Sequence, residues 1–133
     1  MTPVFADTFY FVALLNESDN AHNQAVACSR DANLNVVTTP WILTEVADGF
    51  SSKFSRKGFL QLYDAIYDDS SVCVVPATQA LFDSGIELYR NRSDKEWSLT
   101  DCISFVVMKE RRITEALTGD HHFEQAGFKM LLK

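Results

Sequence analysis

The fold is decided by the stretch Trp97-Ser98-Leu99-Thr100-Asp101-Cys102-Ile103-Ser104-Phe105-Val106-Val107-Met108, in which a short polar turn ends in one carboxylate and leads into an apolar run. A helix without a polar face is buried nearly all round, so these residues predict a central helix. Asp101 then lies in its first turn, where the N-terminus favours a negative charge. Taken alone, Ser98-x-x-Asp101 is also the signature of a capping box, which is a purely structural role.

Strand-like and helix-like segments alternate on both sides of this stretch. Apolar or β-branched runs predict strands at 4–6, 35–39, 72–76, 113–118 and 128–132. Apolar residues at helical spacing predict helices at 8–15, about 21–30, 40–50, 59–67 and 78–89. The alternation predicts an α/β fold, with a mostly parallel sheet of four or five strands covered on both faces.

Two further expectations concern single segments. The run 72–76 is the clearest candidate for a buried strand, because it is continuously apolar until Pro76 ends it. Residues 119–123, which include two adjacent histidines, are expected to form a turn. Such a pair more often belongs to a surface turn or a cap than to a metal site.

Size and composition limit the class of protein. A chain of 133 residues fits one domain, 1–133. No apolar run approaches the roughly 18 residues of a membrane span, and the N-terminus has no basic region typical of a signal peptide. Three cysteines without a C-x-x-C pair indicate buried thiols and a cytoplasmic protein; they are Cys28, Cys73 and Cys102.

The net charge of −6 bears on nucleic-acid binding. Proteins that hold nucleic acid by charge alone are usually basic, so that simple class is disfavoured. A nuclease whose acids bind metal ions remains open, because bound cations invert the local charge.

Four acidic residues fall where the carboxyl ends of predicted strands meet. Asp7 follows the first strand, Asp120 follows the fourth, Asp101 opens the central helix and Glu45 lies on the helix after the second strand. Ligands of open parallel sheets bind outside these strand ends, and Mg²⁺ or Mn²⁺ prefers oxygen ligands. Considered one at a time, each acid also has a purely structural interpretation. Asp7 and Asp120 fit helix caps as well as metal ligands, and Glu45 fits a solvated helix residue. The pattern indicates a metal site without proving that the acids meet.

The ordered motifs resemble those of the PIN-domain nucleases, especially the VapC-type toxins of bacterial toxin–antitoxin pairs. Residues 97–105 look like the third-acid motif of this family, and residues 116–128 look like the fourth motif and its tail. Asp7-Thr8 after an apolar strand is similar to the opening motif, and residues 43–46 fit the second. The likeness covers nearly the whole chain in the family's order; one departure is Ser93, where relatives often have proline.

This resemblance implies a three-layer α/β/α sandwich and a ribonuclease that hydrolyses RNA phosphodiester bonds with Mg²⁺ or Mn²⁺. Carried across by position, the metal-binding and catalytic acids are Asp7, Glu45, Asp101 and Asp120. Hydroxyls commonly found beside them match Thr100 and Thr118, and less closely Thr8. Thr100 is expected to cap the central helix and to orient Asp101.

The resemblance also implies partners: a small antitoxin protein and a second copy of the chain. Exposed Phe or Tyr residues within 50–67 are the expected dimer contacts. Contacts to RNA phosphates are expected from two basic clusters, although charged loops are usually just solvated. The clusters are Lys53, Arg56 and Lys57, and Arg90, Arg92 and Lys95.

Two other classes of function stay open as alternatives. One is a catalytically inert PIN-fold binding module, whose simplest sign is the loss of one of the four acids; all four are present. The other is phosphotransfer on a strand-end aspartate. Asp7-Thr8-Phe9 lacks the second acid of an Asp-x-Asp element, which counts against this class.

Overall fold

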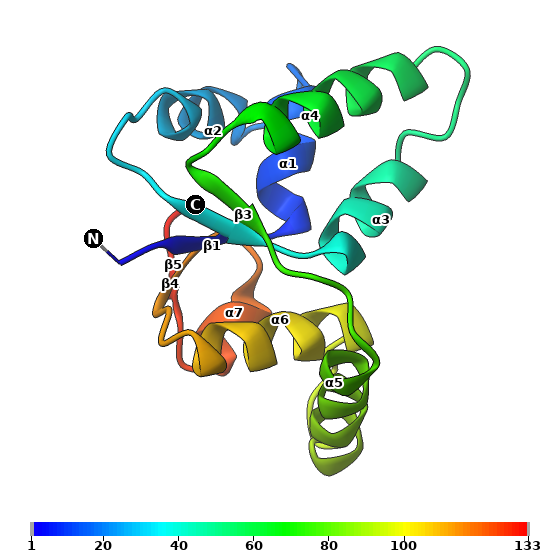
Figure 1. Cartoon of the computed structure of the whole chain (residues 1–133), viewed down its shortest axis with the longest axis vertical. Coiled ribbons are helices and arrows are strands. Elements are labelled where there is room, and N and C mark those ends of the chain that lie inside the picture. The colour runs from blue at the N-terminus through cyan, green and yellow to red at the C-terminus, as the bar shows by residue number, and fades with distance from the viewer. Residues whose placement is uncertain (1, 133) are drawn as a thin grey trace.

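A five-stranded parallel sheet forms the middle layer of the molecule (Figure 1). The computed structural model describes residues 2–132. The strands are β1 (Val4–Ala6), β2 (Val36–Thr38), β3 (Val72–Val74), β4 (Glu115–Leu117) and β5 (Lys129–Met130), in the order β3-β2-β1-β4-β5. The predicted α/β fold with a parallel sheet is confirmed.

Helices cover both faces of this sheet, which confirms the three-layer sandwich. One face carries α1 (Thr8–Leu15), α2 (His22–Ser29), α3 (Pro40–Asp48) and α4 (Arg56–Asp68) (Figure 1). The other face carries α5 (Gln79–Asn91), α6 (Leu99–Glu110) and α7 (His121–Gln125). No helix in the range 2–132 has the length and apolar character to cross a bilayer.

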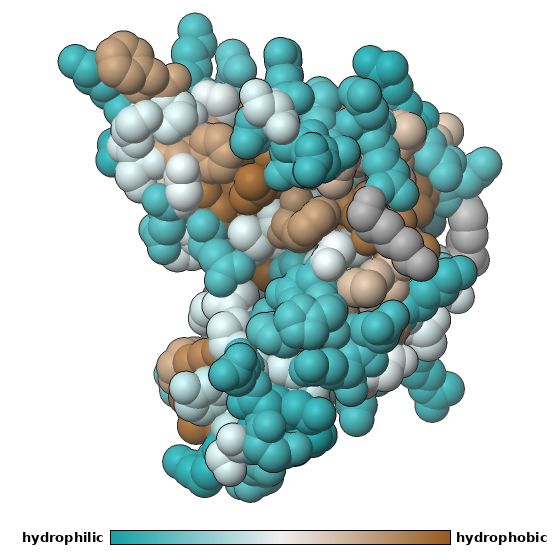
Figure 2. Space-filling model, turned by 180° about the vertical axis from the view of Figure 1, so that it is seen from behind, coloured by the Kyte–Doolittle hydropathy of each residue, from teal (hydrophilic) through white to brown (hydrophobic). Residues whose placement is uncertain are grey.

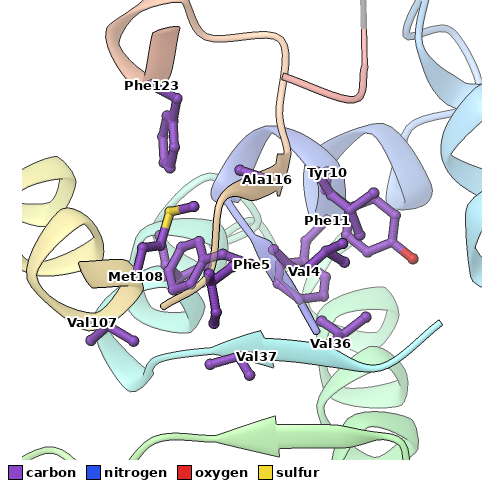
Figure 3. Packing of buried hydrophobic residues seen from close by; sticks show 14 of the residues in the cluster. Val4, Phe5, Tyr10, Phe11, Val36, Val37, Val107, Met108, Ala116 and Phe123 are labelled. Atoms are coloured by element: carbon purple, nitrogen blue, oxygen red, sulfur yellow. The ribbon is translucent and has the colours of Figure 1, made fainter. Parts of the chain in front are cut away.

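The core forms where the central strands meet helices from both layers. All three residues of β1 are buried, as are all three of β2. Figure 3 shows Phe5 of β1 beside Met108 of α6, with Tyr10 and Phe11 of α1 next to Val4. The predicted central helix is α6, whose residues 101–105, 107 and 108 are buried. Its apolar circumference therefore packs as expected.

The packing of α6 against α5 depends on a glycine. A Cβ atom at Gly85 would lie 2.3 Å from Cγ1 of Ile103, which is far inside van der Waals contact. Only a residue without a side chain lets the two helices approach this closely. This contact fixes the position of α6 and of the acid at its start.

Three predictions about burial and local structure are wrong. The run 72–76 is not a buried strand: β3 lies at the sheet edge, where Cys73 is exposed. Of the three cysteines, Cys102 is buried and Cys28 is half-buried. Residues 121–125 form the short helix α7, so the expected turn ends at Asp120. An apolar run predicts a strand but not the position of that strand in the sheet. The exposure of β3 at the sheet edge therefore could not be predicted from the sequence.

Candidate active site

The strand order reverses beside β1, and this reversal positions the site. From β1 the chain proceeds to β2 and β3 on one side, whereas β4 and β5 lie on the other. Asp7 directly follows β1, and Asp120 lies three residues after the end of β4. Such a topological switch point leaves a crevice outside the strand ends, where ligands of open α/β sheets bind.

A hollow of about 370 Å³ occupies this crevice, and all four predicted acids line it. Glu45 reaches it from α3 and Asp101 from the first turn of α6, on opposite faces of the sheet. In Figure 2 the molecular outline is indented at the left, between the part that contains α3 and the part that contains α5. This is the side on which the carboxyl ends of the strands lie. The structure therefore brings together the acids that the sequence predicted.

Asp7 is the most buried of these acids, with 5% of its surface exposed. It occupies the N-cap position of α1 but makes no side-chain capping bond. Its Oδ2 instead accepts a hydrogen bond of 2.8 Å from Oγ1 of Thr118. Burial raises the pKa of Asp7 to about 7, and the negative charges of Asp101 and Asp120 add to this effect, against the lowering by Thr118. The cap interpretation of this side chain is therefore excluded.

Asp101 completes a capping box and also lines the acidic hollow. Its backbone N–H donates to Oγ of Ser98 (3.0 Å), and its Oδ2 accepts from the backbone N–H of Ser98 (3.1 Å), which completes the capping box. Nδ1 of His122 lies 3.1 Å from the same oxygen. Within residues 2–132 the second oxygen, Oδ1, makes no hydrogen bond. Burial raises the pKa of Asp101, with a further contribution from the charge of Asp120.

Two threonines hold the remaining acids. Oγ1 of Thr118 accepts from the backbone N–H of Asp120 at 3.0 Å, so one hydroxyl ties Asp7 and Asp120 together. Asp120 also caps α7, because its Oδ1 accepts from the backbone N–H of His122 at 2.9 Å. Oγ1 of Thr8 donates to Oε1 of Glu45.

Thr100 does not have the capping role predicted for it. The N-cap of α6 is Ser98, with an extended ψ of 165°, and Thr100 lies one residue inside the helix. Its backbone oxygen accepts from Oγ of Ser104 at 2.9 Å. Residues lining the acidic hollow do not include it.

His122 belongs to the site, although the sequence favoured a surface turn. Its side chain is 20% exposed, and its Nδ1 lies 3.1 Å from Asp101 and 3.5 Å from Asp120. His121 is 69% exposed, as a surface residue should be. Asp120, His121 and His122 offer ligand atoms within 4.8 Å of one another. The sequence feature that could have predicted the position of His122 is Asp120, two residues earlier. An Asp at this position caps a helix that begins next to the strand ends.

The predicted RNA-contact residues lie in three places. Arg92 and Lys95 line a second hollow beside the acidic one. Arg90 pairs with Glu87 at 3.1 Å, on the exposed surface of α5. Arg56 and Lys57 open α4, Lys53 lies in the turn before it, and none of the three lines the acidic hollow.

The donor set of the acidic hollow fits a hard divalent cation. Carboxylate oxygens predominate, Glu96 adds another acid to the wall, and no Lys or Arg of the described chain lines it. Mg²⁺ and Mn²⁺ take oxygen ligands of this kind and keep several waters. A cation held here would also stabilise the ionised form of Asp7, which burial otherwise disfavours.

Comparisons with known proteins agree with this geometry. The chain is 27% identical over 125 residues to the 23S rRNA-specific endonuclease VapC20 of Mycobacterium tuberculosis, covering 94% of this chain and 95% of that protein. The crystal structure of that VapC20, described as a Sarcin-Ricin loop cleaving toxin, matches with a TM-score of 0.86 at 25% identity, over 98% of this chain and 99% of the other.

More distant structures share the fold. VapBC2 from Rickettsia felis, bound to a DNA fragment from their promoter, matches with a TM-score of 0.68 at 13% identity, over 98% of each chain. FitAcB from Neisseria gonorrhoeae matches with a TM-score of 0.61 at 15% identity, over 96% of this chain and 95% of that one. The PIN domain matches residues 4–129, nearly the full length, and this chain therefore belongs to the PIN domain family.

Proposed function

We propose that this protein is a metal-dependent ribonuclease that hydrolyses RNA phosphodiester bonds, with Asp7, Glu45, Asp101 and Asp120 holding Mg²⁺ or Mn²⁺. One observation carries the proposal: these acids come from distant parts of the chain and line one hollow at the switch point. The similarity to VapC20, which is named a 23S rRNA-specific endonuclease, supports RNA as the substrate. No observation favours an inert binding module or phosphotransfer.

In this proposal the bound cation supplies Lewis acidity at the phosphate and lowers the pKa of an attacking water. The protein's own part is to hold the acids still. Thr118 fixes Asp7 and Asp120, the Ser98 capping box fixes Asp101, and Thr8 holds Glu45. His122 donates to Asp101 when its proton is on Nδ1, which favours the ionised carboxylate that a cation needs.

Partners and location form the second part of the proposal. VapC20 is described as a toxin, so we infer that this chain is the toxin of a pair and binds a small antitoxin in the cytoplasm. We infer also that it forms homodimers. Exposed aromatic side chains within the expected region support this: Phe54, Tyr63 and Tyr67. Leu60, which was not among the expected residues, adds apolar surface beside them.

Cleavage of a mixed RNA pool tests the enzymatic claim. The purified protein is incubated with Mg²⁺ or Mn²⁺, with or without excess EDTA, and the new RNA ends are mapped. Cleavage is expected with metal, and its loss in EDTA and in Asp101→Asn. Asp64→Asn is the matched control, because Asp64 is exposed on α4 outside the hollow. Undiminished cleavage by Asp101→Asn, or in EDTA, would sink the mechanism.

Expression in bacteria tests the toxin role separately. The wild-type protein should arrest growth, Asp101→Asn should not, and a small protein encoded beside the gene should relieve the arrest. Normal growth at full expression of active wild-type enzyme would refute the toxin role while leaving the nuclease intact.

A further inference from the structure

A second hollow, of about 440 Å³, opens directly beside the acidic one. Glu96 and Ser98 line both hollows, so the two share a wall. The second hollow lies between the C-terminal end of α5 and the segment 92–98 that leads into α6. An RNA strand with one phosphate at the acids would therefore have its next nucleotide beside this second hollow.

The lining of this second hollow differs in charge from that of the first. It contains Arg92 and Lys95 with a single acid, Glu96, whereas acids dominate the neighbouring hollow. The guanidinium of Arg92 is already engaged, because it pairs with Asp94 at 3.0 and 3.1 Å and lies over the ring of Trp97. Lys95 forms no ion pair with any residue from 2 to 132. Its positive charge acts on the exposed Asp94, but no ion pair within this range holds its ammonium, which can therefore meet an anion here.

Tyr89 provides an aromatic face at the same place. It lines the hollow and is 52% exposed, so its ring adds little to the core. Exposed aromatic rings beside a cationic group bind single-stranded nucleic acid by stacking bases, without reading their sequence. A nucleotide needs both features at once, one for its base and one for its phosphate.

We propose that this hollow is the subsite for the nucleotide next to the scissile phosphate, with Tyr89 stacking on its base and Lys95 contacting its phosphate. The proposal rests on the ribonuclease function and deepens it by assigning Tyr89 and Lys95 to that same site; stacking on Tyr89 needs an unpaired base. Arg92 is a positioning residue that holds the segment against Trp97. The negative charge of Glu96, on the wall between the two hollows, would repel a phosphate. Lys95 is therefore the residue that contacts the phosphate.

Binding measurements test this subsite without using cleavage. A fluorescein-labelled single-stranded RNA of mixed sequence, about 12 nucleotides long, is titrated by fluorescence anisotropy with Ca²⁺ in place of the catalytic ion, across a salt series. The variants are Tyr89→Ala, Tyr89→Phe and Lys95→Gln. Tyr89→Phe is the control that keeps the aromatic ring, and Lys129→Gln is the lysine control, on the edge strand β5.

The two contacts predict different signatures. Tyr89→Ala should weaken binding about 5- to 150-fold with an unchanged salt slope, and Tyr89→Phe should retain affinity because it keeps the ring. Lys95→Gln should reduce the slope of log K against log salt by about 0.7, the value for one phosphate contact on a single strand. The controls should match wild type.

Affinities and salt slopes of Tyr89→Ala and Lys95→Gln equal to those of their controls would overturn the subsite. Should Tyr89→Ala prove unfolded by circular dichroism, Lys95→Gln alone decides. Cleavage by wild type with Mn²⁺, measured in parallel, separates the two claims. Normal cleavage with unaffected variants removes only the subsite, and absent cleavage with the predicted binding losses removes only the nuclease.

Discussion

At the scale of single residues, the carboxyl group of Asp7 has the least favourable surroundings in the acidic hollow. It is nearly enclosed, it faces two other acids, and its pKa is raised to about 7. Natural proteins keep such a group where function needs it, since replacing it would otherwise stabilise the fold. The threonine that holds it contributes orientation rather than charge.

A pH titration of stability tests this interpretation of Asp7. Its folded-state pKa lies above its unfolded value near 3.8, so the metal-free native state binds more protons than the unfolded state. Stability should therefore fall as pH rises from about 4 to about 7. Asp7→Asn should reduce this fall, leaving the smaller part due to Asp101, and raise stability above pH 7 by about 1–3 kcal/mol, as measured by urea unfolding in EDTA. Parallel curves for the two proteins over that pH range would refute the assigned pKa.

His122 supplies a second test at the same scale. Groups that hydrogen-bond metal-ligating carboxylates typically affect metal affinity or activity 10- to 100-fold. His122→Ala should lower the cleavage rate by roughly this factor, because Asp101 and Asp120 lose their shared neighbour. His121→Ala serves as control, since its side chain is largely exposed. Equal rates in the two variants would show that His122 has no part in the site.

At the scale of elements, the sequence predicted the alternation of strands and helices because each element has its own periodicity. Pro40 at the first position of α3 and Thr78 at the N-cap of α5 mark helix starts that local chemistry determines. The edge position of β3 and the bridging role of His122 were not predictable, because they depend on which segments become neighbours. The parallel sheet indicated that the four acids gather at one edge, but only the resemblance to the PIN-domain nucleases implied that they form one site.

Gly119, between β4 and α7, packs closely against a ring of the acidic hollow. A Cβ atom at Gly119 would lie 2.6 Å from Cζ of Phe9, whose ring lines the acidic hollow. Gly119→Ala should displace that ring or shift Asp120, and so lower cleavage by about tenfold or more. Gly58→Ala is the control, because a Cβ there meets nothing within 4 Å and the exposed helix α4 should gain up to about 1 kcal/mol. Full activity of Gly119→Ala would contradict this close packing.

At the scale of the whole molecule, the distribution of charge matters more than its total. The net charge of −6 includes the acids that gather in the hollow, while Arg92 and Lys95 lie beside it. Affinity for RNA should therefore depend on the divalent ion as well as on salt. An acidic nuclease and a nucleic-acid substrate are compatible on these terms.

Oligomeric state gives the whole-molecule prediction. Leu60, Tyr63 and Tyr67 leave apolar surface exposed on α4, and a second copy of the chain would cover it. Sedimentation at micromolar concentration should show a dimer for wild type and a monomer for Leu60→Glu, with unchanged circular dichroism. A monomeric wild type, or a dimer that tolerates Leu60→Glu, would place the interface elsewhere or remove it.

Calorimetric titration with Mn²⁺ measures whether the acids at the switch point bind a divalent cation. At pH 7 the wild type should bind Mn²⁺ and release protons, because the ion must displace the proton held by Asp7. Asp101→Asn should lower the affinity by about tenfold or more, and Asp64→Asn should leave it unchanged. Equal Mn²⁺ affinity in wild type and Asp101→Asn, with no proton release, would show that these acids do not form a cation site.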